Sequence, residues 1–178
     1  MAKKLSAALL VHRLREGVLE VLVVHPGGPF WAKKDHGAWS IPKGEYEEDE
    51  QPSDAARREF SEEVGVPVPD GTLLLLGEIK QSSGKVITTF AVRGDVDLHN
   101  FKSNSFEMEW PRGSGEVRSF PEVDRAEWFT TAEARVRLLK GHISFLDRLV
   151  DELRAQGQHF TEGENPRTAD PGAQPRLF

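Results

Sequence analysis

Residues 44–66 read GEYEEDEQPSDAARREFSEEVGV and divide into an acidic loop, a helix and a glycine stop. Pro52 suits the first turn of a helix, because a nitrogen in that turn needs no hydrogen bond within the helix. Gly65 is a natural terminator, and Pro67 cannot continue the helix beyond it. The stretch therefore predicts a helix from about residue 52 to residue 65.

Three glutamates in this helix share one face, since Glu62 and Glu63 follow Glu59 at spacings of three and four residues. Like charges at these spacings repel, and a hard divalent cation such as Mg²⁺ removes that repulsion because it prefers carboxylate oxygen. Phe60 and Val64 fall on another face and can bury against a sheet. The alternative is an acidic helix face that is simply solvated.

The acidic loop carries a partner for the helix, because Glu50 can pair with Arg58 and fix the loop against it. With these residues the stretch resembles the Nudix box, whose pattern is G, five residues, E, seven residues, R-E-U-x-E-E-x-G-U, where U is a bulky apolar residue. Every specified position is filled, by Gly44, Glu50, Arg58, Glu59, Phe60, Glu62, Glu63, Gly65 and Val66.

The resemblance implies an α+β fold, a Nudix-type α/β/α sandwich with a mixed β-sheet and a catalytic loop–helix–loop. It implies Glu59 and Glu63 as principal metal ligands, Glu62 in the same cluster, and the backbone carbonyl of Lys43 as a further ligand. It also implies structural roles for the remaining box residues Gly44, Glu50 and Arg58.

The chemistry implied is hydrolysis of a nucleoside diphosphate linkage with Mg²⁺, or with Mn²⁺ as the alternative ion. Metal ions neutralise and orient a diphosphate and activate water for attack at phosphorus. Glu62 and Glu63 are candidate catalytic residues. Glu122 is a third, because the family often places a carboxylate shortly before a strand that bears a tryptophan, here Trp128. The alternatives are an ordinary loop glutamate at 122, or Glu107 and Glu109 in its role.

Substrate clues are weaker. WSIPKGE, residues 39–45, resembles hydrolases of dinucleoside polyphosphates and some enzymes that clear oxidised nucleoside triphosphates, and we place the dinucleoside polyphosphates first. Hydrolysis of ADP-ribose or a nucleotide sugar, a non-catalytic nucleotide sensor and an acidic interaction domain remain alternatives. Candidate substrate contacts are Lys43, Lys33, Trp31 and Lys80, each weighed against a surface or core role.

Apolar runs predict strands at 5–14, 18–25, 38–41, 73–79, 86–92 and 126–129, and helices at 131–139 and 142–155. Residues 94–121 are predicted to be irregular. We expect one domain over residues 1–156 and a flexible tail over 157–178, where the composition shifts to Gln, Glu, Thr, Pro and Gly.

The chain has 178 residues, a net charge of −6 and no cysteine. The charge argues against binding of duplex nucleic acid, and the lack of cysteine excludes disulfides and suits a cytoplasmic protein. No segment is long and apolar enough to span a membrane. A nucleotide is the expected small-molecule partner, and a homodimer is compatible with the family.

Overall fold

The central strand is β1 (Leu5–Arg15), which pairs with three other strands in the computed structural model, where residues 3–164 are described. The main sheet has the order β4–β5–β1–β2–β8, and β3 also pairs with β1. Its other strands are β2 (Val18–Pro26), β3 (Lys43–Tyr46), β4 (Leu74–Lys80), β5 (Val86–Arg93) and β8 (Val123–Thr130). The helices are α1 (Pro52–Val64), α2 (Thr131–Arg137) and α3 (Ile143–Ala155), with single turns η1 (Leu98–Asn100) and η2 (Lys140–His142).

The sheet is mixed. Strands β1 and β5 run parallel, and the other pairs in this sheet are antiparallel. One edge of β1 serves two partners, because its first half pairs with β3 and its second half with β2. The strand β3, which opens the acidic stretch, is thereby attached to the middle of the sheet.

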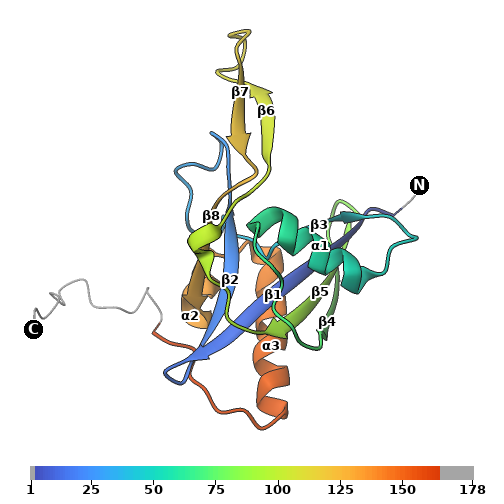
Figure 1. Cartoon of the computed structure of the whole chain (residues 1–178), viewed down its shortest axis with the longest axis vertical. Helices are drawn as coiled ribbons and strands as arrows, with labels where there is room; N and C mark the ends of the chain where they lie inside the picture. The colour runs from blue at the N-terminus through green and yellow to red at the C-terminus, as the bar shows by residue number, and fades with distance from the viewer. Residues whose placement is uncertain (1–2, 165–178) are drawn as a thin grey trace, which may run out of the picture.

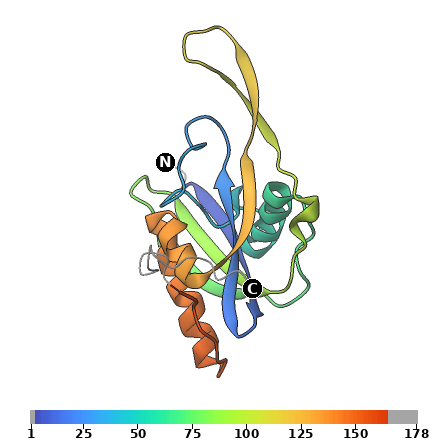
Figure 2. The ribbon, with the colours of Figure 1, turned by 90° about the vertical axis from the view of Figure 1, so that its left-hand side faces the viewer.

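Alternate residues of β1 enter two separate cores. Ala7, Leu9 and Val11 pack with Phe60 of α1, while Leu10 packs with residues of α2 and α3. Figure 2 shows the sheet lying between α1 on one side and α2 and α3 on the other. The predicted α/β/α sandwich with a mixed sheet is confirmed.

The predicted strand at residues 38–41 is wrong. Trp39 and Ser40 form only isolated bridges, to Leu138 and Val24, and the strand begins at Lys43. Pro42 has no N–H to donate to a ladder, while the side chains of Trp39 and Ile41 are fully buried. The apolar character of this segment reflects core packing and not strand pairing.

The prediction of irregular structure over residues 94–121 is also wrong. Strands β6 (Ser105–Glu109) and β7 (Val117–Pro121) form an antiparallel hairpin. Phe106 lies opposite Phe120, with ring centroids 6.0 Å apart, and this cross-strand pair stabilises the hairpin. Figure 1 shows the hairpin projecting from the body of the molecule.

The segment after α3 departs from the predicted tail as far as residue 164. Thr161 bridges to Val18 at the edge of β2, and Glu162 pairs with Arg135 at 2.7 Å. Polar residues hold this segment through backbone pairing and charge, which composition alone does not indicate. The remainder of the predicted tail lies outside the described residues. Within residues 3–164, no helix has the length and apolar character needed to cross a membrane.

Candidate active site

The apolar side of helix α1 is anchored in the core, which sets the direction of its glutamates. Phe60 and Val64 are fully buried beneath it. Gly65 ends the helix in the left-handed conformation, with φ at 71°, and its N–H donates to Ser61 O at 2.8 Å. The glutamates of the last two turns therefore occupy a helix whose rotation and end are both fixed.

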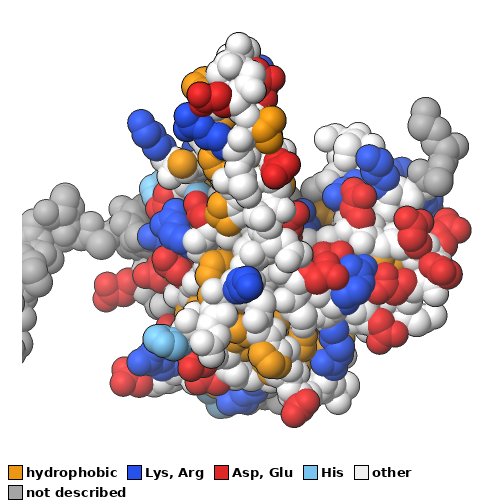
Figure 3. All heavy atoms as spheres, turned by 45° about the horizontal axis from the view of Figure 1, so that its top comes forward, with side chains coloured by type: hydrophobic (Ala, Val, Ile, Leu, Met, Phe, Trp, Pro, Cys, Tyr) orange, Lys and Arg blue, Asp and Glu red, His pale blue; other side chains and the backbone are white. Residues whose placement is uncertain are grey.

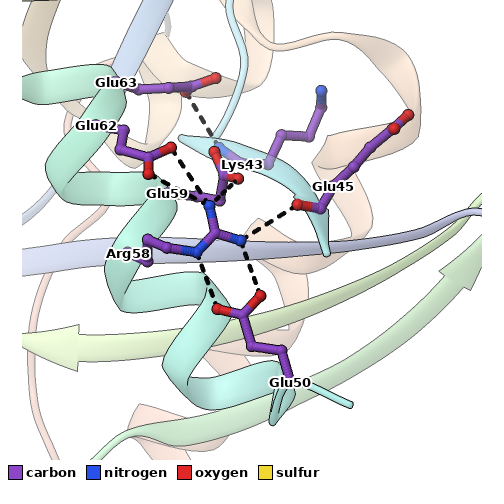
Figure 4. Close-up of polar contacts among 7 residues, drawn as sticks. All are labelled: Lys43, Glu45, Glu50, Arg58, Glu59, Glu62 and Glu63. Carbon is purple, nitrogen blue, oxygen red and sulfur yellow. Dashed lines mark hydrogen bonds and ion pairs between the residues drawn. The ribbon is translucent and has the colours of Figure 1, made fainter. Parts of the chain in front are cut away.

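Arg58 joins the acidic loop to the helix, as Figure 4 shows. Its Nε and Nη2 each donate to one carboxylate oxygen of Glu50 at 2.9 Å, and its Nη1 donates to Glu59 Oε1 at 2.7 Å. These bonds lower the pKa of the Glu50 carboxyl and raise the pKa of the Arg58 guanidinium. The predicted pairing of Glu50 with Arg58 is confirmed.

Gly44 is required by the position of Glu59. A Cβ atom on residue 44 would overlap the Glu59 carboxylate, and that clash involves the whole carboxylate group. Strand β3 therefore passes directly against the acidic face of α1. Burial raises the pKa of Glu59, although its hydrogen bond to Arg58 opposes that effect.

Glu63 is the most perturbed carboxyl group of the helix. Burial raises its pKa to about 7, although the backbone N–H of Lys43 donates to its Oε2 at 3.1 Å. The positive charge of Lys43 lowers the pKa, and the negative charges of Glu59 and Glu122 raise it. Among the described residues Glu63 has no cation in an ion pair, so a carboxylate here is stabilised by a bound cation.

Glu122 lies between β7 and β8, directly before β8, and is exposed. Its backbone N–H donates to Asn104 O at 2.8 Å, and its carbonyl accepts from Gly27 N–H at 2.9 Å. Its negative charge raises the pKa of Glu63, so the Glu122 segment belongs to the same region as the helix carboxylates. The alternatives Glu107 and Glu109 lie on β6, and Glu109 accepts from Gly115 N–H within the hairpin.

The donor chemistry of this region fits a hard divalent cation, since carboxylate and carbonyl oxygens are the ligands that Mg²⁺ prefers. The perturbed Glu63 and the close approach of Glu59 to β3 supply such oxygens at one place. Across residues 3–164, no three acidic or histidine side chains are already gathered into a metal cage. Glu59 accepts from Arg58 at Oε1, and its Oε2 has no hydrogen bond within the described part of the chain, which leaves that oxygen to a cation.

The family model of the NUDIX domain matches residues 3–153, which is most of the chain. The chain belongs to the Nudix family. It is a pyrophosphohydrolase of that family, which acts on nucleoside diphosphate derivatives and generally uses divalent cations. No curated protein matches the chain.

Solved structures support the fold. The NUDIX domain of Shewanella oneidensis NrtR complexed with ADP ribose is 17% identical, with 86% of this chain and 90% of that chain covered and a TM-score of 0.59. A C. elegans Ap4A hydrolase binary complex is 18% identical, with 84% of this chain and 98% of that chain covered and a TM-score of 0.59. A mutT/nudix family protein from Listeria innocua is 16% identical, with 88% of this chain and 98% of that chain covered and a TM-score of 0.58.

The backbone and side chain of Lys43 serve different faces of the Nudix sheet. Lys43 pairs with Ala8, which belongs to the core beneath α2 and α3, whereas Gly44 pairs with Ala7 on the α1 face. Its side chain accordingly points away from the carboxylate of Glu63 in Figure 4. The Lys43 backbone N–H contacts Glu63, whereas its ammonium acts on the glutamates through charge alone.

The other predicted substrate contacts are spread over two loops. Lys33 is exposed between β2 and β3, and Lys80 is exposed at the end of β4. Trp31 is partly buried against the core beneath α2 and α3, and the ammonium of Lys34 lies 4.9 Å from its ring centroid. The packing role left open for Trp31 is thus present in the structure. Figure 3 shows basic side chains gathered over the β2–β3 loop and acidic ones over α1 and the segment before it.

His25 and Asp124 are not predicted from the sequence, yet they join two parts of the site. His25 Nδ1 lies 2.7 Å from Asp124 Oδ1, although 99 positions separate the residues. The available signal is a histidine that ends an apolar strand directly before Pro26, Gly27 and Gly28. That signal gives no partner, because the pairing depends on where β8 joins β2.

Proposed function

We propose that the chain hydrolyses a diphosphate linkage of a nucleoside polyphosphate with Mg²⁺. The observation that carries the proposal is Glu63, a partly buried carboxyl group whose pKa burial raises to about 7 and which forms no ion pair within residues 3–164. Glu59 lies one turn away on the same face, and the charge of Glu122, which precedes β8, acts on Glu63 from outside the helix. A cation shared by these oxygens relieves the repulsion among them.

Each residue of the cluster has a distinct role in the proposal. Glu59, Glu63 and the Lys43 carbonyl hold the cation, which supplies charge neutralisation at the phosphates when bound. Glu62, whose side chain is 46% exposed, adds a carboxylate at the solvent side. Arg58 and Glu50 keep the loop and helix in register.

Glu122 accepts the proton of the attacking water. The water oxygen forms a bond to phosphorus, the bridging anhydride bond breaks, and the leaving phosphate takes the electron pair. Exposure of Glu122 suits this role, because the residue must reach a water molecule and return the proton to solvent.

A dinucleoside polyphosphate is the proposed substrate class. Support comes from the WSIPKGE segment at residues 39–45 and from the exposed Lys33 and Lys34, whose charges match a long phosphate chain. Oxidised nucleoside triphosphates come next, followed by ADP-ribose and nucleotide sugars. One similar solved structure is complexed with ADP ribose and another is an Ap4A hydrolase, so these structures do not rank the classes.

A substrate panel tests the proposal. Diadenosine polyphosphates, 8-oxo-dGTP, ADP-ribose and nucleotide sugars are incubated with and without Mg²⁺, and products are separated by anion exchange. Glu63→Gln and Glu122→Gln remove the proposed groups, and Glu152→Gln on exposed α3 is the matched control. We expect Mg²⁺-dependent turnover of a diadenosine polyphosphate that is lost in the first two variants and kept in the third.

Other outcomes reject parts of the proposal. Turnover of a different class would replace the substrate and leave the role of the glutamates intact. Tight nucleotide binding without turnover would establish the sensor alternative. Full activity of Glu63→Gln would remove the proposed metal site.

A further inference from the structure

His25 is a buried side chain near the site, and both of its ring nitrogens have hydrogen-bond partners. It lies on β2 and has no exposed surface. Its Nε2 lies 2.6 Å from the carbonyl oxygen of Lys34, and its Nδ1 lies 2.7 Å from Asp124 Oδ1. One imidazole therefore bridges the loop after β2 and the start of β8.

Both contacts contain a proton. A carbonyl oxygen only accepts, so Nε2 must carry hydrogen. The short contact between Nδ1 and Asp124 also needs a hydrogen, supplied by either partner. The contact is therefore a hydrogen bond whichever partner carries the proton, and with the Lys34 bond it fixes the orientation of the imidazole ring.

The bridge ends beside Glu122. Asp124 follows Glu122 by two residues on β8, and the N–H of Gly27, two residues after His25, donates to the Glu122 carbonyl. A Cβ atom on Gly27 would overlap the carbonyl of Pro121, so the two backbones are in direct contact. The end of β2 thus holds the Glu122 segment through both a backbone bond and the His25 side chain.

The second arm of the bridge fixes the cationic loop. Trp39, which packs edge-on to His25 at 5.1 Å, donates from Nε1 to Asp35 Oδ1 at 2.7 Å. Lys34 is anchored by its carbonyl, while the side chains of Lys33 and Lys34 remain exposed. The loop backbone is held while its charges face solvent.

We propose that His25 is a positioning residue for the hydrolysis, fixing Glu122 through Asp124 and the Lys33–Lys34 loop through the Lys34 carbonyl. This inference rests on the proposed role of Glu122. His25 touches no reacting atom in this account, and Asp124 acts through its hydrogen bond and not through its charge.

Asp124→Asn separates the hydrogen bond of Asp124 from its negative charge. With Asp124→Asn, a neutral imidazole keeps Nε2–H on Lys34 and accepts at Nδ1 from the asparagine amide. The imidazole keeps its position, while the negative charge at residue 124 is lost. Asp124→Ala loses both the hydrogen bond and the charge. The Asp124 side chain is 30% exposed, so neither change opens a large buried cavity.

The experiment measures kcat and KM on the best substrate, together with Mn²⁺ affinity and melting temperature. We expect Asp124→Ala to lower kcat by about 10- to 100-fold, the range typical of residues that orient a reacting group. We expect Asp124→Asn to stay within about threefold of wild type, a small effect because the hydrogen bond is kept. Mn²⁺ affinity is unchanged in both, and Asp147→Ala, which removes an exposed carboxylate paired with Arg135, is the matched control.

His25→Ala releases both arms, so we expect a lower kcat and also a raised KM. An equal loss in Asp124→Asn and Asp124→Ala would overturn the inference, because the charge would then be the acting feature. Unchanged kcat in both, with Glu122→Gln inactive, would overturn it and leave the proposed function standing. Active Glu122→Gln would instead remove the proposed base, and the inference with it.

Discussion

Gly44→Ala tests how closely β3 approaches the acidic face of α1. The backbone of Gly44 is not in the left-handed region, so alanine fits the chain conformation. The obstacle is the Glu59 carboxylate, which the new Cβ would overlap. Glu59 must turn outwards, and its 2.7 Å bond to Arg58 is then lost.

The size of the effect follows from these contacts. A hydrogen bond between charged groups contributes about 1.5–3 kcal/mol, and we take the lower end because the Arg58 side chain is 39% exposed and keeps Glu50. Replacing glycine by alanine also stabilises the folded protein by about 0.4–1 kcal/mol, because it restricts the unfolded chain. We expect a net loss of about 1 kcal/mol in the free energy of unfolding, or about 2–4 °C in melting temperature.

Equilibrium urea unfolding in two backgrounds measures this coupling. In Glu59→Ala the obstacle is absent, so Gly44→Ala should be neutral or stabilising there by up to about 1 kcal/mol. The two substitutions should therefore be strongly non-additive. An equal cost of Gly44→Ala in both backgrounds would show that Glu59 is not what excludes a side chain at position 44.

Three further changes have defined outcomes. Glu63→Gln should abolish turnover and should raise the free energy of unfolding of the metal-free protein near pH 8 by about 1 kcal/mol, because it removes a carboxylate that forms no ion pair. A variant that is less stable than wild type in urea unfolding would contradict this. Burial, aided by the charge of Arg93, lowers the pKa of His12 to about 4 from 6.5. The unfolded state therefore binds the proton first, and stability should fall by about 3 kcal/mol as the pH drops through that window. Melting curves of His12→Asn, with the exposed His36→Asn as control, should lose the His12 share of that dependence, while the buried His142, whose pKa burial also lowers to about 4, keeps its own share. Phe60→Ala should cost about 3–4 kcal/mol in urea unfolding by opening a cavity beneath α1, and a cost under about 1 kcal/mol would place Phe60 outside the core.

The acidic stretch was predictable because its information is local. The spacing of the glutamates, the stop at Gly65 and the pair Glu50–Arg58 all lie within residues 44–66. Helix periodicity and charge pairing over one or two turns do not depend on the rest of the chain. The sandwich followed from the same stretch through family resemblance.

The hairpin β6–β7 depends on partners that are far away in sequence. Gly28 leaves space for the Phe106 ring, and Phe30 stacks edge-on against Trp110 at 5.4 Å. These contacts join residues about eighty positions apart, so a segment rich in Gly, Ser and Pro reads as irregular. Tertiary packing overrides the local preference there.

Strand register decides the remaining differences. The side chain of Lys43 leaves the glutamate face because Lys43, and not Gly44, pairs with Ala8. A shift of one residue would reverse this arrangement. The bridge from His25 to Asp124 likewise requires the pairing of β2 with β8, where the register shifts between His25 and Pro26.

A Mn²⁺ titration tests the central claim, that glutamates of α1 hold the cation that makes diphosphate hydrolysis possible. Bound Mn²⁺, followed by electron paramagnetic resonance, and product release from a diadenosine polyphosphate are measured in the same samples of wild type and Glu63→Gln. The account predicts that binding and turnover rise together in wild type and that both are lost in Glu63→Gln. Turnover that persists without a divalent ion, or that survives in Glu63→Gln, would contradict it.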